Sequence, residues 1–215
     1  MTQKADDTKE SILACAKEEF SLKGFMDASL RSIAERAGLT TGAIYRYFED
    51  KDSLFGALVA PLAQRLNEGF ANEVALYCRL LNEGRPFDSL MEIMLDGIPA
   101  IVDFIYADYD TMRLLACRCA GSSFERYFDE LAQRDAEETR HFIEIAYAGR
   151  QGKPNIDSAH MDILMRLTYK AVLEIVALEM PRDEADRYIL VLSEFIQAGW
   201  GRILGGHPQS YADLH

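Results

Sequence analysis

Two tyrosines flank an arginine in the segment TTGAIYRYFEDKDSLF: Tyr45 and Tyr47, with Arg46 between them. A tyrosine can place its ring against thymine methyl groups and its hydroxyl against phosphate oxygens. Ile44 and Phe48 have the spacing of an inward face, which turns Tyr45 and Arg46 outward and leaves Tyr47 at the flank. An eight-residue helix cannot bury every side. Three stacked core aromatics are the alternative, and we expect burial only for Phe48.

A helix, a tight turn and a second helix are predicted in residues 29–48. Ser29 can cap the first helix, whose inward residues share helical spacing: Leu30, Ile33, Ala34 and Ala37. Gly38 ends that helix because glycine enters the left-handed region at low cost, and Thr40 caps the next helix. The pattern is that of a helix-turn-helix, in which the second helix enters the major groove of DNA.

The remaining chain also predicts helices, so the fold class is all-α. The first helix is expected over residues 8–23, with a capping box between Asp7 and Glu10 and a stop at Gly24. Asp50 caps a fourth helix, which Pro61 should kink or end. Further helices are expected over these ranges: 62–81, 89–106 with a bend at Pro99, 109–120, 123–147, 158–180 and 182–204.

Composition limits the classes of protein that remain. The chain has 215 residues, of which 49% are hydrophobic and 27% charged, and it has no apolar run long enough to span a membrane. Its start is polar, and we expect a cytoplasmic protein. The net charge is −12. Residues 1–58 carry eight Lys and Arg against ten Asp and Glu, so any contact with DNA must use a local face.

Residues 8–55 resemble the tetracycline-repressor (TetR/AcrR) family of bacterial transcription regulators. The resemblance rests on a set of fixed positions: Phe20, Gly24, Phe25, Ser29, Ile33, Ala34, Ala37, Gly38, Gly42, Tyr45, Phe48, Lys51 and Leu54. So many positions over about fifty residues are far more specific than one short motif. The match covers about a quarter of the chain, and histidine is common in the family where Tyr47 stands here.

The resemblance implies roles for individual residues. Arg31 resembles a phosphate or base contact, and Lys51 an anchor to the DNA backbone. The groove-facing end of the recognition helix would be Thr40, Thr41, Gly42 and Ala43. The full set of expected DNA contacts is Ser29, Arg31, Thr40, Thr41, Gly42, Ala43, Tyr45, Arg46, Tyr47 and Lys51.

The resemblance also implies an architecture of about nine helices. Residues 1–58 would form a three-helix DNA-binding domain, and residues 59–215 an effector-binding and dimerisation domain. The protein would be a homodimer that binds a palindromic operator and represses transcription in response to a small molecule. The last two helices would form the dimer interface, through Leu164, Thr168, Val172, Ile175, Leu192, Phe195, Ile196 and Gly199.

Methionines and aromatic residues of the larger part suit an adaptable pocket for an apolar or aromatic effector, although they suit an ordinary helical core equally well. The expected lining is Phe70, Met94, Ile98, Phe104, Met112 and Phe128. No cofactor is expected. A ligand-independent DNA-binding protein remains an alternative.

A helical-bundle metal or carboxylate enzyme is the competing class. Glu138 and His141 have the Glu-x-x-His spacing of di-iron bundles, but the second pair, Asp157 and His160, has the wrong acid. A lone match of this kind arises easily by chance. A further acidic face, formed by Glu92, Asp96 and Asp103, reads as solvated, with a site for a cationic ligand as the alternative. We therefore expect neither a catalytic nor a metal site.

Overall fold

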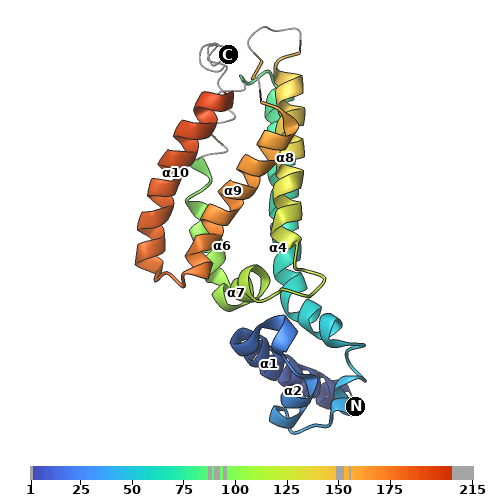
Figure 1. The fold of residues 1–215 in the computed structure, drawn as a ribbon. Coiled ribbons are helices and arrows are strands. Elements are labelled where there is room, and N and C mark those ends of the chain that lie inside the picture. Colours follow the sequence, from blue (N-terminus) through green and yellow to red (C-terminus); the bar gives the residue numbers. More distant parts are fainter. Residues whose placement is uncertain are drawn as a thin grey trace. The chain divides into compact units, whose positions relative to one another are not determined.

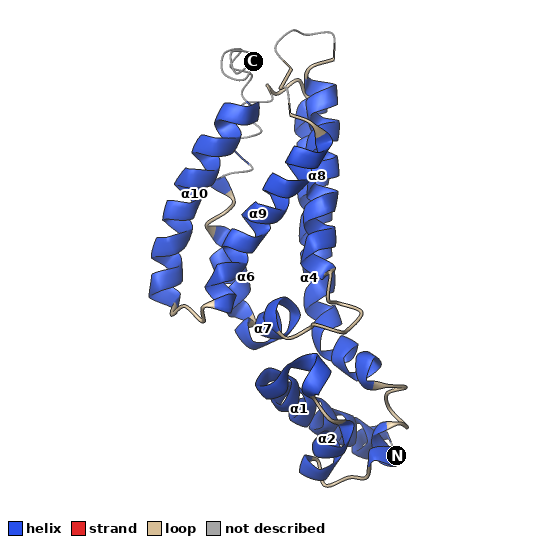
Figure 2. Cartoon of the chain, viewed as in Figure 1, coloured by secondary structure: helices blue, strands red, loops and turns tan. Residues whose placement is uncertain are grey.

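The computed structural model describes residues 2–86, 89, 93, 96–148, 153–154 and 156–204. All regular structure within these ranges is α-helical, which confirms the predicted fold class (Figure 2). The chain divides into two compact units. Unit 1 comprises Met1–Asn67 and Asp108–Tyr127, and unit 2 comprises Glu68–Ala107 and Phe128–His215.

Unit 1 is built around a cluster of phenylalanine rings. Its helices are α1 (Thr2–Asp27), α2 (Leu30–Arg36), α3 (Thr41–Ile44), the first part of α4 (Lys51–Asn82) and α7 (Tyr109–Cys117), as drawn in Figure 1. Phe55 lies at the centre of the cluster, with ring centroids 5.1 Å from Phe20, 5.4 Å from Phe25 and 6.4 Å from Phe124. Edge-to-face ring packing of this kind stabilises a core beyond its burial of apolar area.

The first helix differs from the prediction at its start. It begins at Thr2, so Asp7 lies inside the helix and the expected capping box with Glu10 is wrong. No proline or glycine precedes Asp7 to stop the helix from extending backwards. The predicted interruption at Gly24 is confirmed, because that glycine has a φ of 74° and separates two helical segments.

The fourth helix runs through its proline. Pro61 was expected to kink or end it; an end there is wrong, because α4 continues to Asn82, and a kink stays a prediction. Val59 and Leu62, beside the proline, are almost fully buried. Burial of these side chains offsets the one backbone hydrogen bond that a proline removes.

Unit 2 contains the end of α4 together with α6 (Ala100–Ala107), α8 (Tyr127–Ala146), α9 (Ser158–Ala177) and α10 (Arg182–Leu204). The bounds of α10 and the start of α9 are as predicted. Pro99 lies in the turn before α6, where a bend within a longer helix was expected. The start of α8 was predicted at residue 123, but Ser122 forms a turn there, and the helix begins only at Tyr127.

Helix α10 packs against both α9 and α6. The Tyr188 hydroxyl donates to the Ala171 carbonyl at 2.7 Å, and the Trp200 indole N–H donates to the Thr168 hydroxyl at 3.2 Å. These bonds join the middle of α9 to two positions of α10. Within the part of the chain that is described, no helix is both long and apolar enough to cross a membrane.

Candidate nucleic-acid interface

The first helix of the predicted motif, α2, begins and ends as its sequence indicates. The Ser29 hydroxyl accepts a hydrogen bond from the backbone N–H of Ser32 at 3.5 Å. Gly38 has a φ of 68°, and in the turn that it forms the Leu39 N–H donates to the Ala34 carbonyl at 2.8 Å. A side chain larger than hydrogen would be strained at such a φ, so the glycine sets the angle of the next helix.

The second helix, α3, is shorter than expected. Thr40 caps it by accepting from the Ala43 N–H at 3.3 Å, but only Thr41–Ile44 are α-helical, and a turn follows. Ile44 is fully buried and Phe48 is 6% exposed, as the spacing predicted. Four helical residues with one buried edge leave the opposite edge in solvent.

Tyr45 and Arg46 lie on that solvent-facing edge. The Tyr45 side chain is 54% exposed, and Gly42 and Arg46 are exposed with it. Tyr47 is half-buried at the flank. Ala43 is only 7% exposed, so it packs inward and can meet a ligand only through its backbone.

Two basic residues of the predicted interface have partners within unit 1. Arg31 donates to Glu35, four residues along α2, at 2.9 Å, and this exposed pair leaves its other N–H groups free to turn toward an anion. The Lys51 ammonium donates to the carbonyls of Met26 and Ala28 at 2.9 and 3.3 Å. It also lies 4.6 Å from the centre of the Phe25 ring. Lys51 therefore joins the start of α4 to the end of α1.

A buried carboxylate holds α1 against α2. Glu19 is 2% exposed and accepts from the Lys23 ammonium at 2.8 Å, the Ser32 hydroxyl at 3.0 Å and the Ser29 N–H at 3.3 Å. Burial alone would raise the pKa of Glu19, but the bonds from Lys23, Ser32 and Ser29 outweigh it and lower that pKa. Sequence reasoning missed this residue. The pattern that could have identified it is an acidic residue seven positions after Ile12, and therefore on the apolar face of the first helix.

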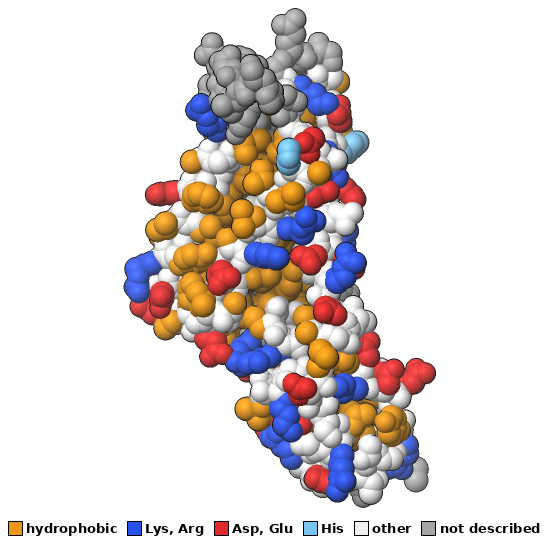
Figure 3. Space-filling model, viewed as in Figure 1, with side chains coloured by type: hydrophobic (Ala, Val, Ile, Leu, Met, Phe, Trp, Pro, Cys, Tyr) orange, Lys and Arg blue, Asp and Glu red, His pale blue; other side chains and the backbone are white. Residues whose placement is uncertain are grey.

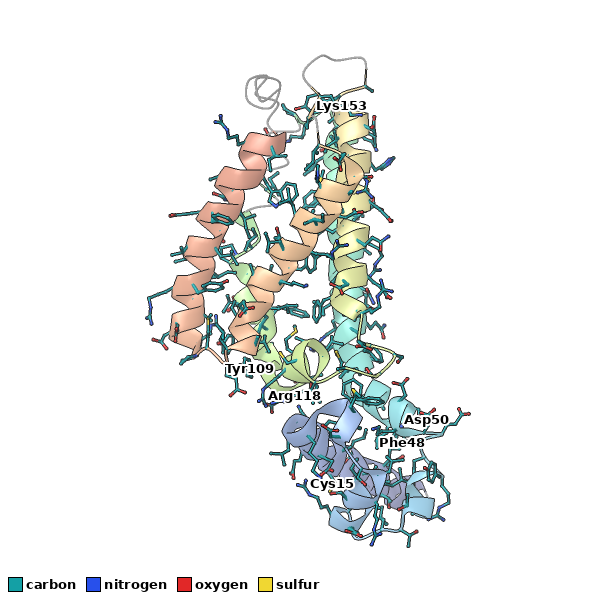
Figure 4. All side chains as sticks on the ribbon, viewed as in Figure 1. Cys15, Phe48, Asp50, Tyr109, Arg118 and Lys153 are labelled. Atoms are coloured by element: carbon teal, nitrogen blue, oxygen red, sulfur yellow. The ribbon has the colours of Figure 1, made fainter. Side chains whose placement is uncertain are left out.

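The start of α4 is fixed by a reciprocal capping box, which confirms the predicted cap (Figure 4 labels Asp50). The Ser53 N–H donates to the Asp50 carboxylate at 2.7 Å, and the Asp50 N–H donates to the Ser53 hydroxyl at 3.0 Å. Asp52 then accepts from the Ser123 N–H at 2.8 Å. The Phe25 N–H donates to the carbonyl of Arg118, at the end of α7, also at 2.8 Å. Residues 118–123 thus complete the unit that presents α3.

The residues expected to line a pocket divide between the two units. Phe70, Phe104 and Phe128 are half-buried in unit 2, and Ile98 is 9% exposed there. Met112 belongs to unit 1, in whose core it is 2% exposed. Met94 lies outside the described residues. The pocket lining as a whole stays a prediction.

The residues expected at a dimer interface divide into three groups by their exposure. Ile175, Leu192 and Ile196 are buried within the single chain, at 0%, 8% and 5% exposure. Phe195 is 72% exposed, and Gly199 is exposed beside it. The other three, Leu164, Thr168 and Val172, are half-buried.

Among the apolar residues that α9 and α10 leave in solvent are Ile163, Leu167, Val191 and Phe195, each more than half exposed. We call these four the α9–α10 apolar face. Figure 3 shows hydrophobic side chains gathered over both helices on the side in view. Exposed apolar clusters of this kind mark contact surfaces.

The residues of the competing metal site have local roles. Asp157 caps α9 by accepting from the His160 N–H at 2.8 Å, and the His160 ring contacts the same carboxylate. His141 is exposed on α8. Among the described residues, no three His, Cys, Asp or Glu side chains are grouped to hold a metal ion.

The capped α2, the Gly38 turn and the exposed edge of α3 define a helix-turn-helix protein. Residues 12–58 match the family model described as "Bacterial regulatory proteins, tetR family". The helix-turn-helix segment of the chain is thus similar to that of this family.

Relatives of the chain are named as transcriptional regulators. It is 35% identical over 100 residues to the regulator AcrR of Shigella flexneri, a match that covers 46% of this chain and 44% of AcrR. It is 25% identical over 114 residues to the uncharacterized regulator YdgC of Bacillus subtilis, covering 53% and 55% of the two chains. The chain thus spans about half the length of the curated relatives that it matches.

The fold extends the likeness beyond the matched segment. A TetR-like transcriptional regulator from Rhodococcus sp. RHA1 superposes with a TM-score of 0.53 at 22% sequence identity. The superposition covers 89% of this chain and 96% of that one. At this identity the likeness describes the fold alone.

Proposed function

We propose that the protein is a sequence-specific DNA-binding regulator that represses transcription from an operator in the bacterial cytoplasm. The observation that carries the proposal is the exposed edge of α3. There Gly42, Tyr45 and Arg46 project from a helix whose other edge is fixed by Ile44 and Phe48. In a helix-turn-helix this edge meets the bases of the major groove.

The recognition edge is small, which favours a dimer on a palindrome. One four-residue helix can read only a few base pairs, and two copies related by a two-fold axis double the site. The α9–α10 apolar face supplies the surface for a second copy of this chain, because two such faces would remove one another from water. Half-sites should then lie about one helical turn apart, or a multiple of it.

Unit 2 is the proposed effector-binding part. A helix-turn-helix needs none of α6, α8, α9 or α10 to present α3. An effector with an apolar or aromatic body, bound among these helices, would change operator affinity by preferring one conformation of the protein. A ligand-independent repressor would bind its operator with the same affinity whether or not such a compound is present.

The test begins with selection of bound fragments from genomic DNA, followed by titration of the selected operator. Tyr45→Ala removes a ring and a hydroxyl from the groove, and we expect operator affinity to fall by about 1–3 kcal/mol. Arg46→Ala should also weaken binding, since it removes a positive charge beside the DNA. Arg187→Ala, an exposed arginine of α10 paired with Asp183, is the matched control and should bind like wild type.

Fluorescence anisotropy with the operator measures specific binding, and with a scrambled duplex it measures non-specific binding. If the Tyr45 variant and the wild type bound the operator with equal affinity, the proposal that α3 contacts the DNA would be wrong. A purified protein that selects no DNA at all would overturn the proposed function.

A further inference from the structure

Unit 2 holds two carboxylates and two tyrosines close together, at the level where α4, α8 and α9 meet. Glu73 and Tyr77 lie one turn apart on α4, Asp135 lies on α8 and Tyr169 on α9. The Tyr169 hydroxyl is 3.2 Å from the Asp135 carboxylate and donates to it. Burial is the main cause that raises the pKa of Tyr77 and that of Tyr169, and the Glu73 and Asp135 carboxylates raise both further.

The Asp135 carboxylate has few hydrogen-bond donors for its degree of burial. It is half-buried, and the Tyr169 hydroxyl is its one hydrogen-bond donor among the described residues. No lysine or arginine of the described chain forms an ion pair with it or with Glu73. Burial raises the pKa of Asp135 to about 6, so at neutral pH the group is mostly an anion without a counter-ion. A carboxylate of this kind is expected to be paired or hydrogen-bonded more fully.

A second polar group beside Asp135 is unpartnered. Thr139 is 2% exposed, and its hydroxyl has no hydrogen-bond partner. Asp135, Thr139 and Phe142 follow one another at i, i+4 and i+7, so they share one face of α8. A buried hydroxyl without a partner is costly in a finished core, and such groups point to a missing molecule.

Aromatic rings flank these polar groups. Tyr77 is 8% exposed and packs edge-on against Phe142, with centroids 6.0 Å apart and an interplanar angle of 85°. A positive charge beside a carboxylate and aromatic rings gains both ionic and cation–π attraction. A neutral or anionic ligand would leave Asp135 unpaired or would be repelled by it.

We propose that Asp135, Thr139 and Tyr169, with Glu73 and Tyr77 beside them, form the binding site for an organic cation that carries N–H donors on an aromatic or apolar body. The ammonium would donate to Asp135, the Thr139 hydroxyl would take a further polar contact, and Tyr77 and Phe142 would contact the body. The inference rests on the proposed function in one respect, since it names the chemistry of the effector that unit 2 would bind.

The experiment compares two probes of the same shape by calorimetric titration of the full chain at about pH 8. These are 2-(1-naphthyl)ethylamine, which is then an ammonium ion, and the neutral alcohol 2-(1-naphthyl)ethanol. We expect the ammonium to bind roughly tenfold more tightly than the alcohol. Asp135→Asn should abolish that preference, and Asp129→Asn, which removes the same charge from an exposed position of α8, should preserve it.

Thr139→Val is a second variant that does not depend on the charge. It replaces the unpartnered hydroxyl with a methyl group of similar size, so it should raise the Tm by a few degrees while weakening the ammonium probe several-fold. Equal binding of the two probes to wild type, or equal loss in Asp135→Asn and Asp129→Asn, would overturn the inference. Operator titrations without probe judge the proposed function separately. A protein that binds operator but not the ammonium refutes only the cation site, and one that binds the ammonium but no DNA refutes only the regulator.

Discussion

Glu19 shows how one buried charge can organise a recognition unit. A carboxylate at 2% exposure is stable only when its oxygens are hydrogen-bonded, and here Lys23, Ser32 and the Ser29 N–H do so. Ser29 and Ser32 belong to the first turn of α2 and its cap. The carboxylate therefore fixes the position of the motif's first helix from beneath, without contacting DNA.

We expect Glu19→Gln to lower the free energy of unfolding by about 1–3 kcal/mol, because the amide loses the charge-assisted bonds and adds donors that face other donors. The pKa of Glu19 lies below its ordinary value of 4.5 in the folded protein. Its contribution is therefore complete above about pH 4.5 and is lost as the pH falls through the lower folded-state value. Urea unfolding from neutral to acidic pH should show the variant and wild type converging in acid. A constant difference would mean that the carboxylate's charge is not the cause.

Asp135 should have the opposite effect on stability. Its folded-state pKa is raised to about 6, from an ordinary value of 3.8, so folding favours the protonated form. Stability is then greatest below about pH 4 and declines as the pH rises through about 6. Glu73, Glu138, Tyr77 and Tyr169 face the group, and Arg134 lies beside Tyr169.

Asp135→Asn should thus be more stable than wild type at pH 7 and no more stable in acid. Thermal unfolding followed by circular dichroism measures this difference, and Asp129→Asn serves again as the control. A variant less stable than wild type at pH 7 would show that Asp135 has a stabilising partner.

At the scale of the elements, capping and turn residues predicted individual helix ends better than the full length of a helix. Asp50 caps α4, and Arg182–Leu204 form α10, as expected from turn residues and apolar spacing. Helix α4 does not end at Pro61, because the burial of its neighbours outweighs a lost hydrogen bond, and that burial cannot be read from a local window of sequence. The pairing of Asp135 with Tyr169 could not be predicted either, since the two residues are 34 positions apart on different helices.

The segment after α7 packs closely against the end of α1, and the absence of a side chain at Gly121 makes this close packing possible. Gly121 has a φ of 84°, and a Cβ built there would lie 2.8 Å from the Cγ atom of Met26. Gly121→Ala therefore combines backbone strain with a steric clash, and we expect it to lower the free energy of unfolding by about 1–3 kcal/mol.

Gly69→Ala is the matched control. Gly69 lies within α4, and nothing stands within 4 Å of the position of its Cβ. Since alanine is the better helix former, this variant should be more stable by about 0.5–1 kcal/mol. Denaturant unfolding of both variants tests the pair. Unchanged stability in Gly121→Ala would mean that Met26 and its surroundings relax without cost.

At the scale of the whole molecule, neither compact unit is continuous in sequence: each is built from two separate segments of the chain. A boundary at residue 58 follows from the helix-turn-helix pattern, and it stays a prediction. Unit 1 also takes up residues 108–127, because Phe124 packs on Phe55 and the Arg118 carbonyl accepts from the Phe25 N–H. Tyr109 and Arg118 mark the ends of the returning helix, α7 (Figure 4). No local sequence pattern predicts that a segment so distant along the chain packs against the first helices.

The proposed dimer can be tested at the α9–α10 apolar face. Phe195 is 72% exposed in the single chain, so Phe195→Arg should leave the fold of each chain intact. In a dimer built on this face, however, it would bury an unpaired charge on each side of the two-fold axis. We expect multi-angle light scattering to report a monomer and operator affinity to fall by about 2 kcal/mol or more, because a single α3 reads too few bases. Leu22→Arg is the control, since Leu22 is also 72% exposed but lies on α1 in unit 1. Its mass in solution should remain that of a dimer. A dimer in both variants would place the contact between copies on another surface, and a wild-type monomer would leave the α9–α10 face for a different partner.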